Sequence, residues 1–324
     1  MDSKTGNAGR CRNNNIRRDK VIAVKNITKR FGDITAVDDL SFEVQKGEIF
    51  GIVGPDGAGK STLLRMMSGI LLPGSGVVEI NGENIQSNLY RIKENLAYMP
   101  QRFGLYEDLT VEENIFFFGR LFGVSKKEIK ERIPALYDFS RLGPFKDRLA
   151  GKLSGGMKQK LGLACSLIHS PDLILLDEPT NGVDPVSRRE FWKILYTLLG
   201  DGVTIVVSTA YLDEAERCNR VAMMDKGKFL RNGKPSDIKK TIGGVMLEIV
   251  TDNVWRAEEV MMKHLKNNNI IREGNSLKIF VSSGVKEKEA IKRILEKEKI
   301  HVSSVTIKVP TLENCFMEIV ADNG

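Results

Sequence analysis

Apolar and polar residues follow three successive patterns along this chain. In "VIAVKNITKRFG" and "AVDDLSFEVQKGEIFGIVG" the apolar positions recur with a period of two and are punctuated by glycine, which predicts strands from Val21 onward. The run "IFGIVG" is almost continuously apolar, as is typical of a strand buried on both faces. The apolar spacing in "STLLRMMSGIL" is helical. A strand, a glycine-rich loop and a helix are therefore expected in that order.

A helical region interrupts this pattern. From Leu109 to Leu149 the spacing is helical, and Thr110 with Glu113 has the sequence of a capping box. We interpret residues 100–165, approximately, as a helical insertion. A helix starting near Ser154, the strand "LILLD", another helix, the strand "VTIVVS" and "VAMMDKGKFLRNG" follow. Strands that alternate with helices indicate a parallel sheet and an α/β fold.

The pattern changes again after "KPSDIKKTIGG". The segments "VMLEIV", "SLKIFVSS" and "HVSSVTIKV" have strand character, and each is followed by a helical segment. We therefore expect three parts: a disordered basic tail at 1–20, an α/β domain at 21–240 and a small α+β domain, ferredoxin-like in pattern, at 241–324. No internal repeat is visible.

Composition limits the class of protein. The 324 residues are 41% hydrophobic and 28% charged, which fits about two globular domains. The net charge of +7 is modest, and the basic tail is interpreted as a solvated leader rather than a lipid-binding segment. The four cysteines are far apart, which argues against a disulfide framework or a zinc site and fits a reducing cytosol. Because no apolar run reaches about 18 residues and no signal peptide is evident, we expect a cytoplasmic protein that reaches membranes through a partner.

The segment "GPDGAGKST" matches the phosphate-loop pattern G-x-x-x-x-G-K-[ST] between the expected strand and helix. Glycines let backbone N–H groups turn toward phosphate oxygens, and the helix start adds its positive dipole end. Lys60 would reach the β- and γ-phosphates and Ser61 would ligate Mg²⁺. The alternative, a glycine-rich turn without function, is disfavoured by this context. The expected nucleotide-binding residues are Gly54, Pro55, Asp56, Gly57, Ala58, Gly59, Lys60, Ser61 and Thr62.

Two carboxylates stand at the C-terminal end of the strand "LILLD". Asp177 at the strand end is placed to hold Mg²⁺ through water, and Glu178 to polarise an attacking water. Such carboxylates also occur as simple surface or capping residues. Together with a phosphate loop they indicate a nucleoside triphosphatase.

A second anion-binding helix start lies between these motifs, in "LSGGMKQK", where Ser154 precedes Gly155 and Gly156. With all three motifs, residues 21–235 resemble the ABC-type ATPases. The resemblance implies a P-loop α/β fold, ATP and Mg²⁺ as ligands, and two such domains that close face to face. Each ATP would be held by one chain's phosphate loop and by the other chain's Ser154, Gly155 and Gly156 equivalents.

The resemblance assigns further roles. Phe31 would stack on adenine, although a core phenylalanine at a strand end is the alternative. Gln101 would touch Mg²⁺ and water, act in catalysis with Glu178, and sense a membrane partner. The loop 102–109 would line a groove for a membrane subunit's helix, or would simply pack on the helical insertion. Asp184 matches the aspartate that crosses the dimer interface.

One position departs from the family. In "VVSTAYLDEAE", Ala210 replaces the histidine that touches a phosphate in most members. We interpret His169 as a helix-end residue and His264 and His301 as surface residues. The segments "TNGVDPVSRRE" and "VPTLENCFMEIV" resemble ATP-binding subunits of the drug-exporter class, including the first ATPase domain of fused multidrug exporters, which also lacks this histidine.

The sequence therefore predicts an ATPase subunit, peripheral on the inner face of the cell membrane, that drives export by a separate membrane-spanning permease. Loss of the histidine favours a heterodimer with a second ABC ATPase domain, in which only this chain's own site is impaired. One alternative is a nucleotide-sensing regulatory subunit with little hydrolysis. Another is a protein that acts on ribosomes or DNA. It is disfavoured, with no nucleic-acid partner expected, because neither a second ATPase domain nor a long coiled coil is visible in this sequence.

Overall fold

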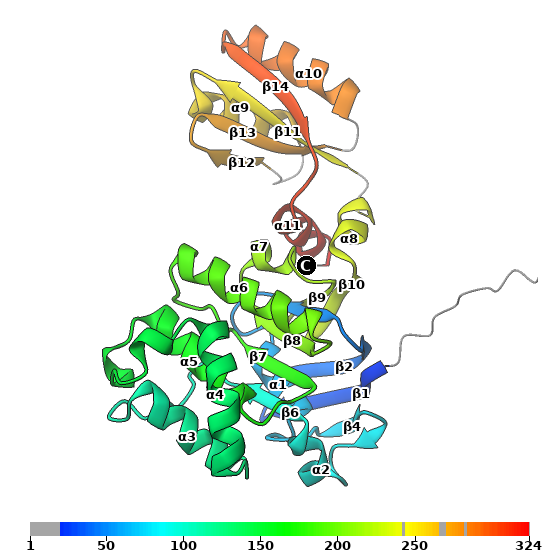
Figure 1. The fold of residues 1–324 in the computed structure, drawn as a ribbon. Coiled ribbons are helices and arrows are strands. Elements are labelled where there is room, and N and C mark those ends of the chain that lie inside the picture. The colour runs from blue at the N-terminus through cyan, green and yellow to red at the C-terminus, as the bar shows by residue number, and fades with distance from the viewer. Residues whose placement is uncertain (1–19, 242–243, 266–269, 282–283, 324) are drawn as a thin grey trace, which may run out of the picture.

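The computed structural model describes residues 20–241, 244–265, 270–281 and 284–323. The predicted disordered tail, apart from Lys20, lies outside these residues. Figure 1 shows a large lower body that contains two sheets, a small domain above it, and the C-terminal helix between the two.

A six-stranded sheet forms the centre of the large body. All its neighbouring strands are parallel except the edge pair β10 and β9. Every residue of β3, β7 and β8 is buried. Burial on both faces explains the continuous apolar sequence of β3 and of the first four residues of β7. In spatial order the strands are β10 (Lys228–Gly233), β9 (Arg220–Asp225), β3 (Ile49–Val53), β8 (Thr204–Thr209), β7 (Leu173–Asp177) and β6 (Leu96–Met99).

A second, antiparallel sheet packs against this one through a shared apolar core that also contains residues of α1. It brings the N-terminal strands next to the loop that follows β3. Its strands, in spatial order, are β2 (Ile34–Gln45), β1 (Lys20–Phe31), β4 (Ser75–Ile80) and β5 (Glu83–Asn84).

Helices α3, α4 and α5 form a lobe at the left of Figure 1, and its apolar core is continuous with that of the central sheet. The predicted capping box is confirmed: Thr110 Oγ1 accepts from Glu113 N at 3.2 Å, and Glu113 Oε2 accepts from Thr110 N at 2.8 Å. The helices of this body are α1 (Lys60–Met67), α2 (Leu89–Glu94), α3 (Val111–Leu121), α4 (Lys126–Ser140), α5 (Gly155–Leu167), α6 (Pro185–Gly200), α7 (Leu212–Ala215) and α8 (Pro235–Thr241).

The small domain has the order β-α-β-β-α-β of a ferredoxin-like unit. Its antiparallel sheet has the order β12-β13-β11-β14, and α9 and α10 share an apolar core with that sheet. The pattern of the sequence did not predict β12. The elements are β11 (Val245–Thr251), α9 (Val254–His264), β12 (Ile270–Glu273), β13 (Ser276–Val281), α10 (Gly284–Lys297) and β14 (Val302–Lys308).

The last helix, α11 (Leu312–Asn323), returns to the large body and packs against α7 and α8 (Figure 1). Leu312, Cys315, Phe316 and Ile319 belong to the apolar core of the large body rather than to that of the small domain. The predicted boundary near residue 240 therefore separates two sequence patterns, but the last helix after it packs in the core of the large body. No helix in the described part of the chain is both long and apolar enough to cross a membrane.

Candidate functional site

The loop between β3 and α1 needs glycine for steric reasons. Gly57 and Gly59 have φ angles of 81° and 105°, in the left-handed region. A Cβ atom on Gly59 would lie 2.1 Å from the carbonyl oxygen of Ala36, and one on Gly54 would lie 2.0 Å from that of Met224. The loop is therefore packed tightly against two neighbouring backbones.

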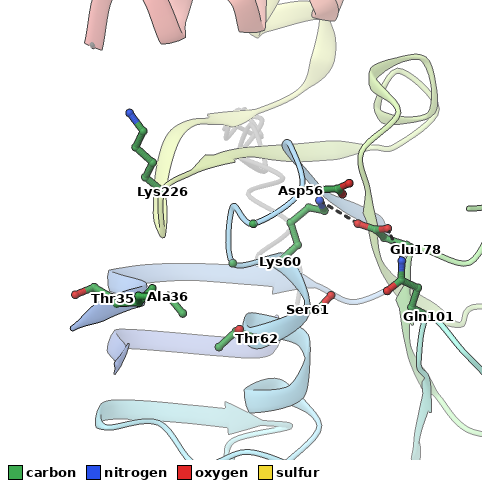
Figure 2. A pocket seen from close by; sticks show the side chains of 12 residues that line it. Thr35, Ala36, Asp56, Lys60, Ser61, Thr62, Gln101, Glu178 and Lys226 are labelled. Carbon is green, nitrogen blue, oxygen red and sulfur yellow. Dashed lines mark hydrogen bonds and ion pairs between the residues drawn. The ribbon is translucent and has the colours of Figure 1, made fainter. Parts of the chain in front are cut away.

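Lys60 points from the first turn of α1 back into this loop. Its Nζ donates to the carbonyl oxygens of Gly54 at 2.8 Å and Pro55 at 3.0 Å. The same Nζ lies 3.0 Å from Glu178 Oε1, and both side chains are buried (Figure 2). The loop lysine and the carboxylate after β7, far apart in sequence, thus form one buried ion pair.

A cavity of about 580 Å³ opens beside this pair. Eight predicted site residues line it, and four further residues were not predicted. Figure 2 places Lys60 and Glu178 on one side of it and Thr35, Ala36 and Lys226 on the other. The predicted residues are Asp56, Gly57, Gly59, Lys60, Ser61, Thr62, Gln101 and Glu178, and the others are Ile34, Thr35, Ala36 and Lys226.

The remaining loop residues shape the cavity from behind. Gly54 and Pro55 bind Lys60 through their carbonyl oxygens, and Ala58 is buried. The carbonyl oxygen of Ala58 accepts from Gly227 N at 3.0 Å, which ties the loop to the turn that carries Lys226. The Asp56 side chain is exposed, so its charge is solvated.

Asp177 is a buried acceptor for three hydroxyl groups. Ser61 Oγ and Ser208 Oγ donate to its Oδ1 at 2.9 Å and 2.8 Å, and the Tyr98 hydroxyl donates to Oδ2 at 3.3 Å. Burial, followed by the charge of Asp177, raises the pKa of Tyr98 to about 12, so this tyrosine remains a donor. The predicted Mg²⁺ residues Ser61 and Asp177 are therefore in direct contact.

This oxygen set suits a hard cation such as Mg²⁺. In the described ranges of the chain, no group of three or more His, Cys, Asp and Glu side chains lies close enough to hold a metal ion. A Mg²⁺ ion at Ser61 and Asp177 would therefore need further oxygen ligands from a nucleotide and from water.

Glu178 has an unusual backbone as well as a buried side chain. Its φ angle of 47° lies in the left-handed region, which costs free energy for a residue other than glycine. Its Oε2 accepts from Gln101 Nε2 and Asn181 Nδ2, each at 3.1 Å. Gln101 and Glu178, both predicted catalytic residues, are thus brought together at the cavity.

The residues of the second predicted anion-binding helix start, Ser154, Gly155 and Gly156, do not lie at this cavity. Ser154 caps α5, with its Oγ accepting from Met157 N at 3.3 Å. Gly155 is exposed, and a Cβ atom on Gly156 would lie 2.5 Å from Ser187 Cβ of α6. None of these three residues lines the cavity.

Phe31 also lies outside the residues that line the cavity, although its strand partner Ile34 is among them. The Phe31 ring is half exposed, and Lys29 Nζ lies 5.5 Å from its centroid. Ile34 is 71% exposed, so the edge beside the cavity presents apolar surface at two adjacent positions. Stacking of a nucleotide base on this surface stays a prediction.

Ala210 is exposed just beyond the end of β8. No histidine of the described residues lines the cavity. His169 lies just beyond α5 with its ring 4.4 Å from that of Phe122, while His264 ends α9 and His301 is exposed.

Part of the loop 102–109 packs on the helical insertion, which was the alternative to its lining a groove for a membrane subunit. The Phe103 ring lies 4.9 Å from that of Phe118 in α3, so the loop packs on the helical lobe. Tyr106 packs 4.4 Å from Phe117, but 48% of its surface remains exposed.

Asp184 caps α6 by accepting from Val186 N at 3.0 Å and Ser187 N at 2.9 Å. The Ser187 contact lowers the pKa of this carboxyl group.

A parallel sheet with a phosphate loop and paired carboxylates at its strand ends defines the class of P-loop nucleotide-binding proteins. Residues 37–181 match the family model of the ABC transporter, and residues 233–320 match the C-terminal domain of ATP-binding proteins like DrrA1-3. The chain belongs to the ABC transporter ATP-binding family, and the predicted fold and family are confirmed.

Two relatives show the range of similarity. The chain is 40% identical over 321 residues to the probable multidrug ABC transporter ATP-binding protein YbhF of Escherichia coli (strain K12), covering 94% of this chain and 53% of that protein. It therefore spans about half the length of this relative. It is also 40% identical over 236 residues to the Nod factor export ATP-binding protein I of Ralstonia nicotianae, covering 72% of this chain and 74% of that protein.

Solved structures give the same result. The ATP-binding subunit of an ABC transporter has a TM-score of 0.62 and 30% identity, covering 69% of this chain and 93% of that one. The dimeric cassette MJ0796 has a TM-score of 0.60 and 28% identity, and the match covers 66% of this chain and 98% of that one.

Proposed function

We propose that this chain binds and hydrolyses MgATP to drive export through a separate membrane-spanning permease. The observation that carries the proposal is the buried contact between Lys60 and Glu178 beside a cavity lined by the phosphate loop. The relatives described above are a probable multidrug ABC transporter ATP-binding protein and a Nod factor export ATP-binding protein, which supports export as the direction of transport.

The contacts of Lys60 suggest how binding prepares the site. A triphosphate would compete for the ammonium group that now binds two loop carbonyls and Glu178. If Lys60 Nζ bound the phosphates in place of Glu178, Glu178 Oε1 would be free to accept a proton from water. Gln101, which already donates to Glu178 Oε2, would hold the carboxylate in place. A bound Mg²⁺ ion at Ser61 and Asp177 would supply charge neutralisation for the phosphate oxygens.

An exposed aromatic and aliphatic surface fits the permease contact. Tyr106 lies in the loop that follows Gln101 and packs on Phe117 of α3, and both are more than a third exposed, as are Leu121 and Phe122 at the C-terminal end of α3. A permease helix bound at Tyr106 and Phe117 would contact the loop that directly follows Gln101, a residue that lines the cavity. Binding of a permease at Tyr106 could thus shift Gln101 at the cavity, which lies only a few residues earlier in the chain.

Dimer formation follows from the distribution of the motifs. Ser154, Gly155 and Gly156 do not line this chain's own cavity, so they are available to the cavity of a second ATPase domain. We propose that this second domain belongs to a different chain that has the histidine absent at Ala210. This chain's site would then be the slower one and act as a long-lived ATP clamp. A nucleotide-sensing subunit with little hydrolysis is the alternative that Ala210 supports.

The test is purification of the tagged chain from detergent-solubilised native membranes, followed by ATPase measurement with and without its partners. We expect co-purification of a multi-span membrane protein and of a second ABC ATPase domain, with much faster turnover in the complex. A complex with turnover as slow as that of the isolated chain would support the sensing alternative. Recovery with ribosomes, or without any membrane protein, would contradict the proposal.

A further inference from the structure

We propose that Glu214 is a positioning residue for ATP hydrolysis, which fixes the segment around position 210 to the turn that follows Glu178. The inference rests on the proposed function and adds to it a residue to which the sequence analysis assigned no role. Glu214 lies in α7, does not line the cavity, and is 1% exposed.

Glu214 joins three segments through one carboxylate. Its Oε1 accepts from Thr180 Oγ1 at 2.7 Å, and Thr180 lies two residues after Glu178. Its Oε2 accepts from Thr209 Oγ1 at 2.8 Å, and Thr209 ends β8 immediately before Ala210. Arg188 Nε of α6 also donates to Oε1, at 3.0 Å. Because each contact is a hydrogen bond to a buried charged acceptor, loss of the carboxylate would leave buried donors without partners.

The residues on both sides of Ala210 are held by this network. Thr209 Oγ1 accepts from Tyr211 N at 3.0 Å, and the guanidinium carbon of Arg188 lies 4.2 Å from the centroid of the Tyr211 ring. The backbone at position 210 is therefore fixed although its side chain is only a methyl group. A larger side chain introduced at position 210 would therefore point in a fixed direction relative to Glu178.

The other side of α7 is held by the C-terminal helix. A helix of four residues has little stability of its own, and Ala215 and Cys218 pack in the same apolar core as α11. Glu216 Oε1 accepts from Lys239 Nζ of α8 and from the backbone N of Leu312, each at 3.1 Å. The segment that carries Glu214 thus lies between the hydrolysis machinery and the helix that follows the small domain.

This arrangement predicts a separation of binding from turnover. Among the described residues no hydrogen bond joins Glu214 to the phosphate loop. The loop meets this network only through the backbone, where Gly54 N donates to Thr209 O at 3.3 Å, so affinity for MgATP should persist without the Glu214 carboxylate. The relative position of residue 210 and Glu178 depends on Glu214, so a phosphate-contacting side chain at 210 should act only when Glu214 is present.

The first experiment measures kcat and KM of the full chain with Ala210→His, alone and combined with Glu214→Ala. Supplying one fixed donor to the transition state should raise kcat up to about 100-fold. With Glu214→Ala the gain should fall below about twofold while KM changes less than about threefold, because only a pre-positioned donor is effective. Glu214→Gln, which keeps the length and one acceptor, should recover part of the gain. Asp213→Asn is the matched control, since Asp213 binds the same Arg188 but is exposed, and it should retain the full gain.

The second experiment is amide hydrogen exchange of the same full-length variants, which requires no hydrolysis. Glu214→Ala should accelerate exchange together at Tyr211 and in the turn 180–183, and Asp213→Asn should change neither. An undiminished Ala210→His gain in Glu214→Ala, or acceleration at one segment only or at neither, would overturn the proposal. Failure of the wild type to bind MgATP would instead refute the proposed function and leave the exchange result to decide the role of Glu214.

Discussion

Leu312→Ala tests whether the C-terminal helix is part of the ATPase core. Leu312 opens α11, is fully buried, and packs among residues of the large body rather than of the small domain. Its truncation removes apolar contacts and leaves a cavity, and such changes cost about 2.7–5.0 kcal/mol at fully buried leucines. We therefore expect the ATPase domain to lose about 3 kcal/mol of stability.

The two tryptophans provide the assay. Trp192 is 1% exposed in the core of the large body, whereas Trp255 is 66% exposed on the small domain. In a Trp255→Phe background, urea unfolding followed by tryptophan fluorescence reports the large body alone. The unfolding free energy from linear extrapolation gives the effect of Leu312→Ala directly.

Leu295→Ala is the matched control, because Leu295 is equally buried but lies in the core of the small domain. It should change the Trp192 transition by less than about 0.5 kcal/mol, since distant sites in separate cores act independently. Met317→Ala, at an exposed position of α11, should also have little effect. A Trp192 transition that responds to Leu295→Ala and not to Leu312→Ala would refute the assignment of α11 to the ATPase core.

Two further predictions concern the assembled transporter. The first uses a complex with a partner that has the missing histidine. There, Ser154→Arg should nearly abolish steady-state ATPase activity, whereas Glu178→Gln should lower it only modestly, because Ser154 would serve the partner's faster site. The reverse order of effects would show that this chain's own site performs the hydrolysis. If the proposed permease recruits this chain, the purified chain should sediment with liposomes that contain the permease and not with bare liposomes; equal sedimentation with both would contradict recruitment by the permease.

The sequence predicted those parts of the site that local motifs encode. The loop from Gly54 to Thr62 joins a buried strand to a helix, and Asp177 ends the strand β7. Parallel strands place such ends at one edge of a sheet, so the contact between Ser61 and Asp177 follows from topology.

The unpredicted residues depend on contacts that are distant in sequence. Thr35 and Lys226 reach the cavity because β2 and the β9–β10 turn pack on the loop, with Gly227 N bound to Ala58 O. Neither residue belongs to a local motif. The sequence pattern assigned the last helix to the small domain, whereas in the structure Leu312, Cys315, Phe316 and Ile319 of α11 pack in the core of the large body. Phe31 was assigned to adenine by resemblance, and that role stays a prediction.

The most direct test of the account is the affinity for MgATP of wild type, Lys60→Ala and Lys25→Ala, measured by titration calorimetry on the full chain. Lys60 is buried within the loop, whereas Lys25 is an exposed residue paired with Glu79 and serves as the control. We expect Lys60→Ala to weaken binding at least about 100-fold, because it removes a charge-assisted donor aimed at the phosphates. Lys25→Ala should bind as wild type does. Equal affinity of Lys60→Ala and wild type would contradict the assignment of this cavity as the ATP site.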